Sequence, residues 1–204
     1  MILKPDYNVV SLFDIDFKEI KSLGINAVLF DLDSTVMPSK SGEYPPKVKE
    51  LLNDQVNKEM YSAYLYLDFS GFMGYKGLSG FAAWYKKQAE EEMEHAFKIY
   101  DYIHANGEKV ELLAIAKPNI ALNDELQVLK EGLKHEQYVT SLIHNIYETA
   151  MNEKDYRTMQ FMDWFIKEQC EEEENAEELI SKFEKYGKDL AALYELDKSL
   201  GKRD

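Results

Sequence analysis

The 204-residue sequence is poor in residues that cross-link or bend a chain, with one cysteine (Cys170), five prolines and ten glycines. A single cysteine excludes an intrachain disulfide framework and a cysteine-rich zinc module, and it is typical of a reducing compartment. No apolar run approaches the roughly 20 residues of a membrane-spanning helix, and the N-terminus MILKPDYN lacks the basic-then-apolar layout of a signal peptide. The sequence therefore predicts a soluble cytoplasmic protein.

Basic residues are also scarce, because 24 lysines and arginines face 38 aspartates and glutamates, for a formal net charge of −14. A surface this acidic repels phosphate backbones and anionic lipid. We therefore expect neither nucleic acid nor a membrane as a partner, and cations suit the chain better. The hydrophobic fraction of 45% is sufficient for a folded core.

A linker is predicted near residue 45, where Gly42, Pro45 and Pro46 lie together in PSKSGEYPP. We divide the chain there into an N-terminal appendage (residues 1–45) and a larger domain (residues 46–204). The appendage has four basic and seven acidic residues, so that −11 of the net charge belongs to the larger domain.

The larger domain has the apolar spacing of long helices, as Leu52, Val56, Ala63 and Leu67 illustrate in the first of them. The predicted helices are 46–74, 81–106, 124–151, 155–186 and, after Gly187, a short fifth one at 188–200. Segment 107–123 is too long for a simple turn and is interpreted as a crossover. The predicted fold class is all-α: a four-helix bundle with a long crossover between the second and third helices, preceded by an appendage with one strand-like segment.

Each predicted apolar stripe is interrupted near the middle of its helix by polar side chains. The interruptions are Glu59 in the first helix, Gln88, Glu92 and His95 in the second, Glu136 in the third, and Gln169 and Glu172 in the fourth. An isolated buried carboxylate is costly unless it is paired, protonated or bound to a metal. The sequence offers no matching set of inward lysines or arginines, so a cation from solution is the simplest counter-charge.

Glu92 and His95 form a Glu-x-x-His pair, whose spacing places both side chains on one helical face. Carboxylates with one imidazole suit iron or manganese, and bridging glutamates can hold two ions about 3.5–4 Å apart. The alternative is a plain bundle or coiled-coil assembly without a site, in which the glutamates are solvated and the histidine is a core residue.

Residues 46–204 resemble a bacterial non-haem ferritin along their whole length. The matching stretches are LLNDQVNKEMYSAYLYL, FAAWYKKQAEEEMEHAFKIYDYI, KHEQYVT, MNEKDYRTMQFMDWFIKEQCEEEE and ALYELDKSL. The resemblance implies a ferritin-like fold and iron storage with ferroxidase activity, with Fe(II) and oxygen or peroxide as substrates. Because the short final helix is present, it also implies a homo-oligomer of 24 subunits.

The resemblance implies two iron ions at a ferroxidase centre, a third nearby, and no haem. Glu59, Glu92 and His95 would hold the first ion. A bridging Glu92 and Glu136 would hold the second ion, with Gln169 beside it.

Further site residues come from the same resemblance. Tyr66 would hydrogen-bond the centre or supply an electron, and Glu91, Glu168 and Glu172 would form the third iron site. Cys170 departs from the family, which usually has histidine there, and the four glutamates that follow it disfavour a reactive thiolate.

The appendage contains a second signal, the stretch INAVLFDLDSTV. It resembles the first motif of haloacid-dehalogenase-type phosphatases, which implies Asp31 as the nucleophile, Asp33 as the acid/base and Mg²⁺ between them. The further strands and motifs of that fold are missing before the helical domain begins, so we expect a truncated fragment. A magnesium-dependent phosphatase and a structural cage with weak iron oxidation are kept as alternative functions.

Overall fold

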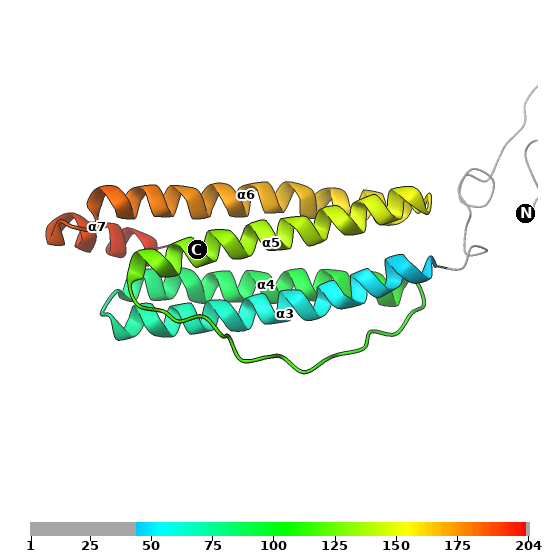
Figure 1. Ribbon diagram of the computed structural model, residues 1–204, viewed down its shortest axis with the longest axis horizontal. Helices are drawn as coiled ribbons and strands as arrows, with labels where there is room; N and C mark the ends of the chain where they lie inside the picture. Colours follow the sequence, from blue (N-terminus) through cyan, green and yellow to red (C-terminus); the bar gives the residue numbers. More distant parts are fainter. Residues whose placement is uncertain (1–43, 203–204) are drawn as a thin grey trace, which may run out of the picture. The chain divides into compact units, whose positions relative to one another are not determined.

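The computed structural model describes residues 44–202, which belong to one compact unit beginning at Tyr44. The helices are α3 (Pro46–Tyr75), α4 (Ser79–Ala105), α5 (Glu125–Asn152), α6 (Tyr156–Tyr186) and α7 (Leu190–Leu200). Four long helices lie side by side, with α3 next to α4 and α5 next to α6, and the short α7 lies at one end (Figure 1). The predicted all-α bundle with a short fifth helix is confirmed, and each helix end lies within two residues of its prediction.

Two predictions concern the N-terminal appendage. The predicted strand-like segment and the phosphatase-like Asp31 and Asp33 lie outside the described residues. The predicted division of the chain at residue 45 stays a prediction.

Local chemistry explains where the helices begin. Pro46, with its fixed φ and missing N–H, opens α3. The carboxylates of Asp124, Asp155 and Asp189 accept hydrogen bonds of 2.9–3.1 Å from backbone N–H groups in the first turns of α5, α6 and α7. These side chains satisfy donors that the helices themselves leave unpaired, so the starts of α5, α6 and α7 are determined by local contacts.

A polar layer divides the apolar core in two. One cluster contains Leu52 and Ile143, and the other contains Phe69 and Phe81. Between the members of these two clusters along the long helices lie buried polar residues: Glu59 in α3, Glu92 and His95 in α4, Glu136 in α5, and Gln169 and Glu172 in α6. The apolar packing therefore holds the polar layer from both ends.

The stripe prediction was wrong for Leu67, which is 50% exposed. Tyr66, Phe69 and Met73 follow the buried face of α3 at that point. Leu67 lies about 100° from Tyr66 around the helix, because one turn takes 3.6 residues, and it therefore points away from the core.

The crossover between α4 and α5 runs the length of the bundle beside α3 (Figure 1). Asn53 of α3 holds the backbone of Glu111 from both sides, accepting from its N–H at 2.7 Å and donating to its carbonyl at 3.2 Å. Asn57, one turn later, accepts from the N–H of Leu113 at 2.7 Å and donates to the carbonyl of Glu111 at 3.0 Å. Two side-chain amides thus fix the path of an extended segment.

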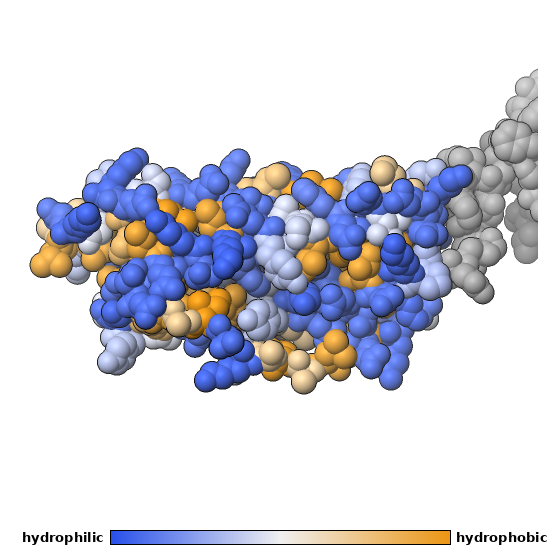
Figure 2. All heavy atoms as spheres, in the orientation of Figure 1, coloured by the Kyte–Doolittle hydropathy of each residue, from blue (hydrophilic) through white to orange (hydrophobic). Residues whose placement is uncertain are grey.

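The crossover exposes the apolar side chains Leu112, Leu113 and Ile115. Most of the face drawn in Figure 2 is hydrophilic, with scattered apolar patches. Within residues 44–202, no helix combines the length and apolar character needed to cross a membrane.

The short helix α7 docks on the start of α4 through a close backbone approach. The backbone N–H of Phe81 donates to Asp197 Oδ1 at 2.9 Å, and both residues are buried. A Cβ added at Gly80 would lie 1.6 Å from the carbonyl oxygen of Asp197. Only glycine at position 80 allows α7 this close to the bundle.

We predict that Gly80→Ala displaces α7 and destabilises the protein by about 1–3 kcal/mol, the usual cost of overpacking a tight contact. Denaturant unfolding measures the loss, and limited proteolysis near residue 190 reports the release of α7. The matched control is Gly71→Ala in α3, where an added Cβ meets nothing within 4 Å. Alanine favours the helix there, so the control should be neutral or stabilising. Equal effects of the two variants would contradict the assigned contact.

Candidate metal centre

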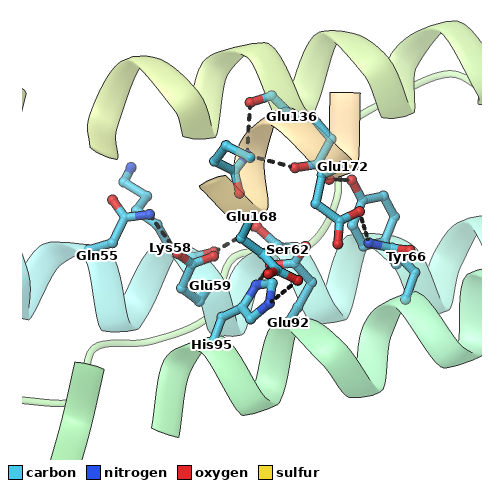
Figure 3. Close-up of polar contacts among 12 residues, drawn as sticks. Gln55, Lys58, Glu59, Ser62, Tyr66, Glu92, His95, Glu136, Glu168 and Glu172 are labelled. Atoms are coloured by element: carbon cyan, nitrogen blue, oxygen red, sulfur yellow. Dashed lines mark hydrogen bonds and ion pairs between the residues drawn. The ribbon is translucent and has the colours of Figure 1, made fainter. Parts of the chain in front are cut away.

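Three of the predicted ligands meet in the middle of the bundle. Glu59 of α3 and Glu92 and His95 of α4 are only 1%, 2% and 5% exposed. One possible ligand atom from each lies within 4.8 Å of the others, and His95 Nδ1 is 3.7 Å from Glu92 Oε2. Figure 3 shows these side chains between α3 and α4. The three-residue spacing of Glu92 and His95 puts both on one face of α4, directed at Glu59.

Two carboxylate oxygens in this group have no hydrogen-bond donor. Gln55 Nε2 donates to Glu59 Oε1 at 2.8 Å. In the described part of the chain, Oε2 of Glu59 and Oε2 of Glu92 are buried without such a partner. Buried polar atoms are nearly always paired, and an unpaired one is costly. Two such oxygens beside an imidazole nitrogen match the donor set that iron or manganese accepts.

Glu136 of α5 lies beside this group and is held from two other helices. The Tyr66 hydroxyl of α3 donates to Glu136 Oε1, and Gln169 Nε2 of α6 donates to Glu136 Oε2 at 3.1 Å. All three residues are buried. The predicted ligand of the second ion is therefore fixed in position by hydrogen bonds to both of its oxygens.

A second group of possible ligands lies next to the first. His95, Glu168 and Glu172 each offer one atom within 4.8 Å of the others, and His95 Nε2 is 3.9 Å from Glu168 Oε1. Glu168 is half-buried, whereas Glu172 is buried and accepts from Gln88 Nε2 at 2.5 Å. Glu91, predicted with them, is half-buried on α4 and lies in neither three-ligand group.

Burial strongly disfavours negative charge at this centre. It raises the pKa of Glu59 and of Glu136 well above the usual carboxyl range, and the carboxylates of Glu92 and Glu172 respectively add to the effect. Burial likewise raises the pKa of Glu92 to about 8. None of the lysine–glutamate ion pairs found within residues 44–202 involves these three. Without a metal they therefore keep protons, which a cation would displace.

Sequence reasoning missed Gln55, and it placed Gln88 on the core face without giving it a role. Gln55 and Gln88 precede Glu59 and Glu92 by four residues, so each lies on the same helical face as a glutamate. That spacing was a readable signal. It predicts the contact of Gln55 with Glu59 but not that of Gln88, which bonds Glu172 on another helix.

A neutral histidine beside the centre was also missed. His135 Nε2 lies 2.8 Å from the Ser62 hydroxyl, which joins α5 to α3. Burial, helped by the charge of Lys58, lowers the pKa of His135 to about 4. The ring is therefore neutral and stands edge-on to the Tyr66 ring, with centroids 5.9 Å apart. Sequence periodicity gives no signal for this pair, because His135 lies off the predicted apolar stripe.

Comparisons with known proteins identify relatives of this chain. The family model described as the ferritin-like domain matches residues 49–186. The chain is 40% identical over 154 residues to the bacterial non-heme ferritin of Staphylococcus haemolyticus (strain JCSC1435), covering 76% of this chain and 93% of that protein. It is 39% identical over the same length to the bacterial non-heme ferritin of Staphylococcus aureus (strain USA300), with the same coverage.

Solved structures give a matching result. A closed form of the Archaeoglobus fulgidus ferritin, engineered by site-directed mutagenesis, superimposes with a TM-score of 0.77 at 40% identity, covering 79% of this chain and 99% of that one. The open-pore ferritin of the same archaeon gives a TM-score of 0.77 at 39% identity, covering 79% and 100%.

The raised pKa of Glu92 predicts a pH-dependent stability in the metal-free protein. The folded state holds the proton of Glu92 up to about pH 8, whereas the unfolded chain releases it near pH 4.5. The contribution of this group to the free energy of unfolding is therefore complete below about pH 4.5 and is lost as the pH rises from 4.5 to 8. Glutamine never has to ionise. Glu92→Gln should therefore become progressively stabilising relative to wild type, by up to about 1.4 kcal/mol per pH unit.

Denaturant unfolding of chelator-treated protein at several pH values measures this difference. Glu90→Gln, an exposed change on the same helix, is the control. A stability difference between Glu92→Gln and wild type that stays constant from pH 5 to pH 8 would contradict the prediction.

Proposed function

The chain belongs to the ferritin-like domain family, and on this premise we propose that it stores iron and oxidises Fe(II) to Fe(III) at the centre around Glu59, Glu92 and His95. The observation that carries the proposal is the pair of buried carboxylate oxygens, on Glu59 and Glu92, that have no donor within the described residues. Fe(II) binding there displaces protons and supplies the missing positive charge.

Two substrate ions bind side by side. Glu59, Glu92 and His95 hold the first ion, and Glu92 bridges to the second, which Glu136 completes. Bridging carboxylates keep such ions about 3.5–4 Å apart. Anionic oxygen ligands stabilise the higher charge of Fe(III) over that of Fe(II), so the ligand set itself favours oxidation. Gln169 orients Glu136 through the hydrogen bond to its Oε2.

Dioxygen or peroxide is the oxidant, and Tyr66, which is hydrogen-bonded to Glu136, can donate an electron. Its hydroxyl donates to Glu136, so that a proton acceptor is already in place when the phenol is oxidised. No haem is involved.

A third ion site beside the centre lets the product leave. Glu168 and Glu172 of α6, with Glu91 of α4, hold this ion, and Glu172 belongs to the acidic run Glu171–Glu174. Hard carboxylate oxygens suit Fe(III), and the ion passes along them to a mineral of hydrous ferric oxide.

The storage compartment is a cytoplasmic homo-oligomer of 24 subunits. The presence of α7 supports this assembly, because the resemblance to non-haem ferritins links the short final helix to the larger cage. The −11 charge of the larger domain would favour iron uptake into such a cage, since an acidic surface concentrates cations.

Glu92→Ala should slow iron oxidation at least about tenfold, because replacing even residues that only support a metal ligand commonly has an effect of that size. The growth of ferric absorbance after aerobic addition of Fe(II) measures the rate. Glu90→Ala, an exposed neighbour on α4, is the matched control and should retain the wild-type rate. A wild-type rate in Glu92→Ala would rule out the proposed centre.

Iron-loaded wild-type protein should elute as a particle near 24 subunits and contain many irons per chain. Size-exclusion chromatography with light scattering gives the subunit number, and elemental analysis gives the iron content. A small oligomer with at most three irons per chain would contradict the cage, whereas a large particle that takes up no iron would support the structural alternative.

A further inference from the structure

A second buried tyrosine, Tyr85 of α4, has no part in the proposed centre. It is 2% exposed, and its ring stacks on that of Tyr66 with centroids 5.8 Å apart and planes 27° apart. The ring of Trp84 stands edge-on to that of Tyr85, with centroids 4.9 Å apart and planes 88° apart. Three oxidisable rings therefore make a continuous series that begins at the residue bonded to Glu136.

The hydroxyl of Tyr85 is accommodated specifically. A Cβ added at Gly132 of α5 would come within 3.3 Å of this oxygen, so glycine leaves room for it. A cavity of about 10 Å³ adjoins it, lined among others by Gln88, Glu136 and Glu172. This is about the volume of one water site, and the lining supplies the polar partners that a water needs. Phenylalanine would fill the aromatic packing equally well, so packing alone does not account for the hydroxyl.

The series reaches solvent at Trp84. This half-buried side chain lines both the small cavity and a groove of about 290 Å³, which Asn175, Glu178 and Lys182 of α6 and Ser199 of α7 also line. Asn175 and Glu178 are exposed. Trp84 therefore stands between the buried rings and the surface.

We propose that Tyr66, Tyr85 and Trp84 form a relay that delivers single electrons to the centre when it holds only one Fe(II). The proposal rests on the ferroxidase function proposed above. Reduction of dioxygen to hydrogen peroxide takes two electrons and two protons; a single Fe(II) supplies only one electron, and the protons come from solvent. The relay supplies the second electron.

Each step conserves protons and electrons. Tyr66 gives one electron to the oxidant, and its phenolic proton goes to Glu136. Tyr85 then reduces the Tyr66 radical, and the Tyr66 O–H bond re-forms with the proton held by Glu136. The Tyr85 O–H bond breaks, and the proton of Tyr85 passes to water in the cavity. Trp84 reduces the Tyr85 radical, which takes that proton back, and loses its indole N–H proton to solvent. A further Fe(II) from solution becomes Fe(III) and restores Trp84, which regains a proton from solvent.

The test uses the full-length assembled protein with one Fe(II) added per subunit in air. Rapid freeze-quench, high-field EPR separates tyrosyl from tryptophanyl radicals, and ferric absorbance is followed in parallel. The relay predicts a tryptophanyl signal in wild type that is lost in Trp84→Phe and in Tyr85→Phe, while Tyr85→Phe keeps a tyrosyl signal. Tyr66→Phe should lose both signals.

Two matched controls should retain the wild-type spectrum. Trp164→Phe changes the other tryptophan, whose ring lies 5.5 Å from His95, and Tyr147→Phe changes a half-buried tyrosine packed against the opposite apolar cluster. Normal ferric absorbance with no tryptophanyl signal, or a signal that survives Tyr85→Phe, would overturn the relay alone. A signal lost in Trp164→Phe and kept in Trp84→Phe would also overturn it. No ferric absorbance in wild type would overturn the proposed function and the relay together.

Discussion

Three buried carboxylates that no lysine or arginine neutralises within residues 44–202 are the constraint on which this bundle depends. Glu59, Glu92 and Glu136 take part in none of the lysine–glutamate ion pairs within residues 44–202. Gln55 and Gln169 donate hydrogen bonds to two of them, which satisfies lone pairs but supplies no charge. The apo centre is therefore held by protons, and a metal ion is the natural replacement for them.

The two apolar clusters make this costly layer possible. They pack the bundle on both sides of the polar residues, so the free energy gained by burying apolar side chains offsets the charge burial between them. They also hold the ligands before any ion arrives, because each ligand projects from a long helix fixed at both ends. Such preorganisation is what a metal centre needs for a defined geometry.

Much of the fold was predictable because its determinants are local. Pro46 and the three aspartate caps fix helix starts from a few neighbouring residues, and the interrupted stripes located the polar layer. Contacts between helices were not predictable in this way. The hydrogen bond from Gln88 to Glu172, and the stacking of Tyr85 on Tyr66, depend on how separate helices pack, which periodicity does not encode.

The hydrogen bonds that Asn53 and Asn57 make to the crossover affect which substitutions the crossover tolerates. Both amides bind peptide groups of Glu111 and Leu113 rather than their side chains. The path of the segment is therefore largely indifferent to which residues occupy it, apart from proline where an N–H is required. Substitutions at the exposed Leu112 or Ile115 would therefore leave the path of the chain within a subunit unchanged.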